Sequence, residues 1–490
     1  MNRKIKVYFV YAGILPAIFY LSYIAPEWIY FLSIIATLLV LIHWSLQVRA
    51  KQKRPKIDLE IVHHTYIGEQ PMVSIHMPIS NEPPELVIRS LKCCLSQDYQ
   101  NFEVIILDNN TTDIHLWKPV EEFCEDHDRL KFVRYPSLEG FKAGALHKCM
   151  LLTGRKTIYT LVIDADYCLK TDALSQAVRR AQRENLDLLQ FPQAYRNINS
   201  GNEALAMDYQ HYFDIYATAA NTEKVMLSTG TLSLFRLESL RELPGWDACN
   251  SITEDAEIGL QFLKANFKTS YCPMILGYGL MPLHARDVCK QRTRWMFGNM
   301  QTLIKNRWKL FSGKDLTIIA QLTAWINFLF PAYLGLFLIL VFGIHNFNLS
   351  ELQIALWLGC VPFLLYILGK FILLYGKPFT ISDLIKTLGV HLYLNFQSSF
   401  VWIPSLLGIK KPFCKTPKQE HTQRKRMLTC TSFIFILFFA MASIALYFQM
   451  LTLSLVYTSL GMIYGASTYF TLNMFRTSPE LEKLNLQTHI

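Results

Sequence analysis

The chain has 490 residues, of which 51% are hydrophobic and only 18% are charged, whereas a soluble domain typically carries about 25% charged residues. This composition excludes a disordered chain or a coiled coil, and the length excludes a small disulfide-bonded secreted fold. The net charge of +10 does not indicate a nucleic-acid partner, because the basic residues gather beside apolar segments, at residues 49–56 and 410–426, as on the cytoplasmic side of a membrane. We therefore expect an integral membrane protein with one large soluble domain.

The apolar segments predict about six membrane-spanning helices in three hairpins, since one span needs ~20 mostly apolar residues. The first hairpin would cover residues 1–48, the second residues 316–375 and the third residues 427–474, before a short cytoplasmic tail at 475–490. Their expected spans are 7–24, 28–48, 316–343, 353–374, 427–448 and 451–474. Four polar residues, three in these spans and one in the stretch 389–409, either line a pore or pack inside the helix bundle: Gln321, Asn327, Tyr366 and Asn395.

A further apolar stretch, residues 389–409, is predicted to lie in the membrane interface. It carries several polar residues and is followed by a run of basic residues that ends at Arg426. If the stretch crossed the membrane, that basic run would lie outside, against the positive-inside rule. We therefore assign residues 376–409 to interfacial helices and residues 410–426 to a cytoplasmic basic loop.

Residues 49–290 have the composition of a soluble domain and alternate short apolar runs with longer mixed segments. The apolar runs predict buried strands at 73–77, 104–107, 131–133, 159–163 and 186–191. Mixed segments such as 84–96 and 142–152 predict helices between them. This alternation is typical of an α/β sheet that binds ligands at the carboxyl ends of its strands. Residues 291–315 would form an interfacial helix that joins this domain to the second hairpin.

Acidic residues occur where such a sheet would bind ligands. Asp108 ends one predicted strand, Asp164 and Asp166 end another, and Glu254 and Asp255 precede a predicted helix. A single aspartate after a strand is most often a cap or turn residue. Two carboxylates two residues apart on an extended segment face the same side, however, and repel each other unless a cation lies between them. Such oxygen ligands suit Mg²⁺ or Mn²⁺, with substrate phosphates completing the coordination shell.

A basic and aromatic motif follows, Gln291-Arg292-Thr293-Arg294-Trp295. One interpretation is an interfacial helix with snorkelling arginines and a tryptophan at the membrane surface. The other is a binding site, in which Arg294 neutralises a departing diphosphate and Trp295 offers a flat face to a sugar ring. Because neither a G-x-G-x-x-G nor a Walker sequence is present, phosphates would be held by a metal ion and by side-chain cations.

In this order, these motifs resemble the signature of the processive family 2 glycosyltransferases of membranes, which include cellulose, hyaluronan and chitin synthases. The resemblance extends to the turn that contains Glu82, to the segment around Lys142, and to a gating loop in which Lys415 replaces the usual valine. Residues 108–113 and 279–282 are more similar to the branch that makes β-1,3-glucans. The resemblance implies an α/β GT-A glycosyltransferase domain inserted in a helical transmembrane domain.

Residue roles follow from the resemblance alone. Glu82 and Asp108 would bind the nucleoside, and Asp164 and Asp166 the diphosphate, with Asp166 acting as a ligand of Mg²⁺ or Mn²⁺. Asp255 would be the catalytic base, with Glu254 beside it. The remaining expected site residues are Lys142 and Arg294 at the diphosphate, Gln291 and Trp295 at the acceptor, and Phe413, Thr416 and Lys418 in the gating loop.

The function implied is processive, inverting polymerisation of a β-linked polysaccharide from a UDP-sugar, with UDP-glucose and a β-1,3-glucan favoured. The polymer would be threaded across a bacterial inner membrane, with the catalytic domain in the cytoplasm. The expected partners are the UDP-sugar donor, the growing polysaccharide and membrane lipids, with an accessory export subunit as a further partner. Two alternatives stay open: transfer of a single sugar to a lipid acceptor, and a catalytically silent membrane subunit.

Overall fold

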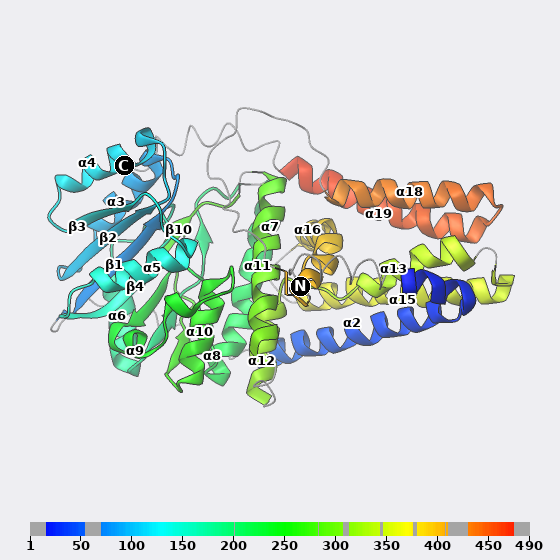
Figure 1. Cartoon of the computed structure of the whole chain (residues 1–490), viewed down its shortest axis with the longest axis horizontal. Coiled ribbons are helices and arrows are strands. Elements are labelled where there is room, and N and C mark those ends of the chain that lie inside the picture. Colours follow the sequence, from blue (N-terminus) through cyan, green and yellow to red (C-terminus); the bar gives the residue numbers. More distant parts are fainter. Residues whose placement is uncertain are drawn as a thin grey trace.

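The computed structural model describes residues 16–53, 70–199, 201–282, 284–306, 313–343, 346–375, 380–406, 408–409 and 430–474. An α/β domain lies at one end of the molecule, long helices lie at the other, and two helices, α11 and α12, stand between them (Figure 1). The expected gating-loop residues Phe413, Thr416 and Lys418 fall outside the described residues, as does the first half of the expected span at 7–24.

A mixed seven-stranded sheet forms the core of the α/β domain, with the order β3-β2-β1-β4-β8-β6-β9. Strands β1 to β4 pair in parallel, and β8 runs antiparallel to both of its neighbours. All five predicted strands are present. The strands are β1 (Met72–Ile79), β2 (Phe102–Asn109), β3 (Leu130–Tyr135), β4 (Thr157–Val162), β6 (Leu188–Gln190), β8 (Ser233–Arg236) and β9 (Thr269–Tyr271).

Helices cover this sheet, as the alternating pattern predicts. In α6, apolar residues recur every three or four positions and are buried against the sheet, and Asn185 ends the helix with a positive φ of 51°. This left-handed residue after the last turn is a common helix stop. The helices of the domain are α3 (Pro84–Leu95), α4 (Ile114–Glu125), α5 (Phe141–Leu152), α6 (Ala173–Glu184), α9 (Leu237–Glu242) and α10 (Glu254–Lys264).

A layer of helices separates the sheet from the helical half. It contains α7 (Glu203–His211), the π-helix η1 (Tyr212–Ala217), α8 (Thr218–Glu223), α11 (Ala285–Asn306) and α12 (Gly313–Thr323). The Gln-x-x-Arg-Trp motif lies inside α11, which begins six residues before the expected interfacial helix at 291–315. The described residues of this region are α11, up to Asn306, and α12, from Gly313, and its location in the membrane interface stays a prediction.

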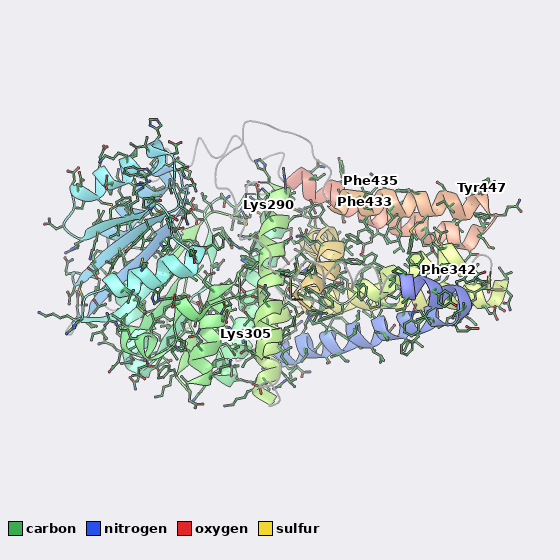
Figure 2. All side chains as sticks on the ribbon, in the orientation of Figure 1. Lys290, Lys305, Phe342, Phe433, Phe435 and Tyr447 are labelled. Atoms are coloured by element: carbon green, nitrogen blue, oxygen red, sulfur yellow. The ribbon has the colours of Figure 1, made fainter. Side chains whose placement is uncertain are left out.

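The helical half contains α2 (Trp28–Gln52), α13 (Phe330–Leu338), the π-helix η4 (Ile339–Gly343), α15 (Leu349–Leu374), α16 (Ile381–Phe400), α17 (Ile403–Leu406), α18 (Cys430–Tyr447) and α19 (Leu451–Met474). Within the described part of the chain, α2 and α15 are long and apolar enough to cross a membrane. Large side chains on this half are widely exposed, including Phe433 at 58% and Tyr447 at 82%. Figure 2 shows both on α18, whereas Lys290 and Lys305 lie on α11.

The expected continuous span at 316–343 is wrong. The chain leaves the helical conformation after Thr323 and resumes it at Phe330, at the start of α13. Pro331 in the first turn of α13 gives the physical reason, because proline has no backbone N–H for a preceding helical turn and restricts the residue before it. The apolar run therefore forms two helices of different direction, α12 beside α11 and α13 beside α2 (Figure 1).

Helix α16 covers much of the stretch that we expected in the membrane interface. A capping box formed by Thr380 and Asp383 starts it, and it packs against α7, α11 and α19. It is seen nearly end-on in Figure 1, across the direction of α2 and α15. Its location at a membrane surface stays a prediction.

The polar residues considered as pore-lining candidates are buried in packing contacts. Gln321 on α12 donates to the Val225 carbonyl at 2.9 Å and accepts from the Leu227 N–H at 3.1 Å. Asn395 Oδ1 accepts from Tyr333 at 2.6 Å and from Tyr464 at 3.0 Å. In this state these side chains join the helices to each other, as the packing alternative predicts.

Candidate active site

A cavity of about 780 Å³ opens at the carboxyl ends of the central strands. Strands β1 and β4 are parallel neighbours, with His76 paired to Val162, so the segments that follow them emerge at the same edge of the sheet. Residues from both segments, from α5, from the start of α10 and from α11 surround the cavity. Its lining includes most of the expected site residues: Glu82, Lys142, Asp164, Asp166, Glu254, Asp255, Gln291, Arg294 and Trp295.

Lys142 lies between the acidic side chains of Asp164 and Glu254. Its Nζ lies 2.5 Å from Asp164 Oδ1, donates to the Gly230 carbonyl at 2.7 Å, and lies 3.9 Å from Glu254 Oε1. Burial disfavours the charged ammonium, but Asp164 and Glu254 outweigh burial and raise the pKa of Lys142 above its ordinary value. The lysine is therefore a fixed positive charge on the cavity wall, where it can meet a phosphate.

The backbone around residue 280 orients Asp166. Its Oδ2 accepts a hydrogen bond of 2.7 Å from the Leu280 N–H, and its carbonyl accepts one of 2.6 Å from Arg196 Nη1. The side chain of Asp164 is 42% exposed towards the cavity. The segment 279–282 thus holds one carboxylate of the Asp-x-Asp pair in place through its backbone.

This donor set fits a hard divalent cation that completes its shell with ligand oxygens. Within the described ranges, no group of three or more His, Cys, Asp or Glu side chains could hold a metal on its own. Mg²⁺ and similar ions are commonly bound by one or two carboxylates together with phosphates and water. Asp166 and Asp164 would supply those carboxylates.

Asp255 lies in the first turn of α10, against the Gly230 backbone. Its Oδ1 accepts a hydrogen bond of 2.8 Å from the Ala256 N–H. Gly230 has a φ of +85°, and a Cβ at that position would stand 2.8 Å from Asp255 Oδ2. Burial and then the charge of Glu254 raise the pKa of Asp255 to about 7, against the opposing effects of Lys142 and Arg294. A carboxylate with such a pKa is suited to proton transfer near neutral pH.

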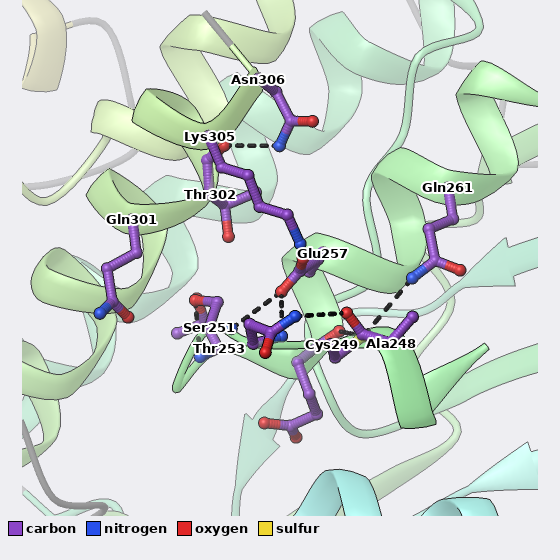
Figure 3. A network of polar contacts seen from close by, with 12 residues as sticks. Ala248, Cys249, Ser251, Thr253, Glu257, Gln261, Gln301, Thr302, Lys305 and Asn306 are labelled. Atoms are coloured by element: carbon purple, nitrogen blue, oxygen red, sulfur yellow. Dashed lines mark hydrogen bonds and ion pairs between the residues drawn. The ribbon is translucent and has the colours of Figure 1, made fainter. Parts of the chain in front are cut away.

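A polar network fixes the loop that leads to Asp255 (Figure 3). Glu257 Oε2 accepts hydrogen bonds of 2.8 Å from the backbone N–H groups of Asn250 and Ser251. Its other oxygen forms an ion pair with Lys305 on α11, and the Ser251 hydroxyl donates to the Gly298 carbonyl at 2.8 Å. The first turn of α10 and the motif helix are thereby held in one arrangement.

The motif helix presents two more expected residues to the cavity. Gln291 accepts a hydrogen bond from the Tyr209 hydroxyl of α7. The ring of Tyr209 stands edge-on to Trp295, with centroids 5.8 Å apart and planes at 85°. Trp295 is therefore held by an aromatic neighbour while it lines the cavity, as an acceptor-stacking residue would be.

Asp108 does not line the cavity. It is 1% exposed, accepts a hydrogen bond from Thr111, and lies 3.5 Å from Arg134 Nε. Thr111 in turn accepts from the Asn81 N–H at 2.8 Å. Asp108 is therefore linked through Thr111 to the turn that contains Glu82. Its buried position outside the cavity lining does not support direct contact with a nucleoside. The next residues, Asn109 and Asn110, do line the cavity.

Sequence reasoning missed the aromatic residues at the inner end of the site. Tyr212 begins the π-helix η1, and Trp325 lies in the turn after α12. Both line a second cavity of about 50 Å³ that shares Asp255 and Trp295 with the large one. A π-helical turn often marks a functional site, but the sequence around Tyr212 reads as an ordinary apolar helix and carries no signal for it.

Comparisons with known proteins find a matching family model and several relatives. Residues 159–373 match the model of glycosyl transferase family group 2. The chain is 26% identical over 267 residues to probable glucomannan 4-beta-mannosyltransferase 7 of Oryza sativa, covering 52% of this chain and 45% of the relative. It is 24% identical over 284 residues to poly-beta-1,6-N-acetyl-D-glucosamine synthase of Staphylococcus epidermidis, covering 56% and 66%.

Among solved structures, the comparison finds the mannosyltransferase PcManGT from Pyrobaculum calidifontis in complex with GDP-Man and Mn²⁺. It is 19% identical, covers 74% of this chain and 99% of its own, and superposes with a TM-score of 0.49. Among the curated relatives, the matched region spans about half of the plant enzyme and about two thirds of the staphylococcal one.

Proposed function

Because the chain carries a family 2 glycosyltransferase domain, we propose that it is a processive, inverting glycosyltransferase that builds a β-linked polysaccharide from a UDP-sugar. We favour UDP-glucose as the donor and a β-1,3-glucan as the product. The long apolar helices α2 and α15 support a further part of the proposal, in which the polymer passes across the membrane next to the site of synthesis.

One observation carries the proposal. A fixed cation, an Asp-x-Asp pair, a carboxylate with a pKa of about 7 and an aromatic face surround the same 780 Å³ cavity, although they come from distant parts of the chain. Transfer of a sugar from a nucleotide needs each of these: charge to hold and release a diphosphate, a base for the acceptor hydroxyl, and a surface to orient the acceptor.

In the proposed mechanism Asp255 accepts the proton of the acceptor hydroxyl as that oxygen attacks the anomeric carbon of the donor. A single displacement inverts this carbon, so an α-linked donor gives a β-linked product. Lys142 and Arg294 stabilise the negative charge that develops on the departing UDP. Trp295 orients the acceptor sugar by stacking, and Glu82 with Asn109 and Asn110 are the cavity residues placed to meet the nucleoside.

A Mg²⁺ or Mn²⁺ ion bound by Asp166 and Asp164 would supply Lewis-acid stabilisation of the diphosphate leaving group. We expect UDP release to be lost with a chelator and restored by adding either ion in excess. Retention of full activity in the chelator, after the purified protein has been shown to be free of metal, would contradict this role for the pair.

The first experiment is to purify the full chain in detergent and to measure UDP release from several UDP-sugars. Polymer formed from UDP-glucose and cut by a β-1,3-glucanase is the expected result. Asp255→Asn should lower the rate by about 10²–10⁴-fold and leave donor binding intact, whereas Asp315→Asn, at the start of α12, serves as a carboxylate control. If Asp255→Asn releases UDP at the wild-type rate, Asp255 is not the catalytic base.

A second candidate is the transfer of one sugar to a lipid acceptor. It is favoured by the small size of the cavity beyond Trp295, about 50 Å³, which leaves little room for a chain of sugars in this state. Analysis of the product separates the two: a labelled glycolipid soluble in organic solvent supports single transfer, and an insoluble polymer supports the processive reaction.

A further inference from the structure

Aromatic side chains line a small cavity that adjoins the active-site cavity at Asp255 and Trp295. Beyond Trp295 the space narrows to the small cavity of about 50 Å³, which is lined by Tyr209, Tyr212, Trp325 and Gln321 among others. This volume holds a few water molecules, and a pyranose ring is much larger. An acceptor whose terminal sugar reaches Asp255 would therefore meet a wall behind that sugar.

Trp325 forms this wall. Its ring stacks on Tyr212, with centroids 5.6 Å apart and planes at 17°, and lies 5.8 Å from the ring of Trp295. It belongs to the turn after α12, where the chain leaves the helical conformation before α13. The position of the ring therefore depends on its side-chain neighbours, because no continuous helix holds its backbone.

Arg292 holds Trp325 from the other side. Its guanidinium carbon lies 3.5 Å from the ring centroid of Trp325, and 4.3 Å and 5.1 Å from those of Tyr209 and Trp295. The side chain is 1% exposed and forms an ion pair with the equally buried Asp208. Its Nε and Nη1 have no hydrogen-bond partner among the described residues, so the aromatic faces are their main neighbours.

A guanidinium held in this way is costly for the fold, since desolvation of a buried ion pair commonly offsets its attraction. Asp208 belongs to α7 and Arg292 to α11, and His391 Nε2 of α16 lies 3.1 Å from Asp208 Oδ1. One carboxylate thus joins the helix that carries Tyr209, the motif helix and a helix of the other half of the molecule. This arrangement is rigid enough to fix the plane of a tryptophan ring.

We propose that Trp325 determines how long a saccharide the acceptor site admits, and that Arg292 is a positioning residue that holds Trp325 in place. The inference rests on the proposed glycosyl transfer at Asp255. With Arg292 and Trp325 in the observed arrangement, the site takes a terminal sugar against Trp295 and excludes the sugars behind it. A longer acceptor enters only when the ring of Trp325 turns aside.

The test compares glucose with β-linked glucose trisaccharides, both 1,3- and 1,4-linked, as acceptors in the UDP-release assay. Trp325→Ala should lower the KM of a trisaccharide about tenfold, the size of effect expected from opening a pocket. The KM of glucose and of the UDP-sugar donor should stay within about twofold. Arg292→Lys keeps the charge beside Asp208 but loses the flat guanidinium face. It should therefore also lower the KM of the trisaccharide relative to the KM of glucose.

Two variants serve as matched controls. Trp325→Phe retains an aromatic ring at this position and should keep the wild-type ratio of trisaccharide KM to glucose KM. Arg236→Lys alters a comparable cluster within the sheet, where Arg236 lies 3.3 Å from Asp187 and 5.7 Å from the ring of Tyr159. Arg236 is remote from both cavities, so this variant should leave the ratio of the two acceptor KM values unchanged.

Direct binding of the same sugars, measured by calorimetry without donor, separates the two hypotheses. If the wild-type chain releases no UDP from any donor, the proposed function fails, and the affinity ratio still reports on Trp325. If Trp325→Ala and Arg292→Lys keep the wild-type ratio of trisaccharide to glucose affinity, the inference is overturned even in an active enzyme. An equal change in donor KM and acceptor KM would also overturn it, because it would indicate general damage to the site.

Discussion

Asp255 illustrates how single residues acquire reactivity in this protein. Its carboxylate is buried beside Glu254, and both effects favour the protonated form, while Lys142 and Arg294 favour the ionised form. The balance raises its pKa to about 7, well above the ordinary value for an aspartate. A base with this pKa is ionised for a large part of the time at neutral pH and still binds a proton strongly enough to remove it from a hydroxyl.

The first prediction at this scale concerns pH. Because Asp255 must be ionised to accept a proton, and because its pKa is raised to about 7, kcat/KM for UDP release should fall as the pH is lowered through 7. The profile is measured from pH 5 to 9 at constant ionic strength. An acid limb near the ordinary aspartate pKa would mean that another group limits the reaction.

A matched pair of variants tests the electrostatic cause. Glu254→Gln removes a negative charge that raises the pKa of Asp255, so the acid limb should move to lower pH. Lys142→Gln removes a positive charge that lowers this pKa, so the limb should move to higher pH. The measurement is kcat at saturating donor, because Lys142 also belongs to the proposed diphosphate site. Shifts of the same sign in both variants would contradict the electrostatic explanation.

At the scale of secondary-structure elements, the close packing of α11 against the loop before α10 sets the site geometry. Gly298 of α11 lies so near Thr253 that a Cβ would stand 2.5 Å from its Oγ1 and 2.8 Å from its backbone nitrogen. Thr253 directly precedes Glu254 and Asp255 in the chain. The distance between the base on α10 and Arg294 and Trp295 on α11 therefore depends on this one glycine.

We predict that Gly298→Ala destabilises the protein by about 1–3 kcal/mol, as overpacking does, and lowers kcat more than it raises donor KM. Thermal unfolding and UDP release measure the two effects. Gly389→Ala in α16 is the matched control, because no atom lies within 4 Å of the Cβ position there and alanine favours a helix by up to about 1 kcal/mol. Equal behaviour of the two variants would show that the packing does not position Asp255.

For the whole molecule, contacts at the end of α2 connect the two halves. Arg49 pairs with Glu223 of α8 at 2.8 Å. Lys51 Nζ donates to the carbonyls of Ile372 at 2.8 Å and Tyr375 at 3.0 Å, at the carboxyl end of α15. A cation there satisfies carbonyls that the helix leaves unpaired and interacts favourably with the helix dipole. Lys51 thus joins α2 to α15 within the helical half, and the pair of Arg49 with Glu223 fixes this half to the helix layer beside the active site.

The proposed membrane location of this half leads to a prediction about α15. Leu364 lies near the middle of the helix and is 57% exposed, so Leu364→Arg would place a charge in the bilayer centre, at about 2.5–3.5 kcal/mol on the insertion scale. We expect less protein in the alkali-washed membrane fraction. Gln353→Arg, near the end of the same helix, should have little effect. Equal retention of both variants would argue against a spanning α15.

From the amino-acid sequence alone, five of the seven strands of the main sheet, several covering helices and most residues around the cavity could be predicted, whereas β8 and β9 were missed. Buried strands are continuous apolar runs, and carboxylates at the ends of parallel strands must meet at one edge of the sheet. These signals are local or follow from the order of elements. For this reason Asp164 and Asp166 could be expected at that edge, whereas Asp255 and Trp295 were expected beside them only through the family resemblance.

The other features of the site appear only in the folded chain. That Asp108 lies beneath the site depends on Thr111 and Arg134, and the raised pKa of Asp255 depends on its burial and then on the charges that surround it. Helix α12 ends at Thr323, inside a long apolar run, so the sequence did not indicate this break. Trp325 contacts Arg292 only because α11 and α12 pack side by side. Contacts between segments distant in the chain leave no periodic signal in the sequence, so their geometry appears only when the chain is folded.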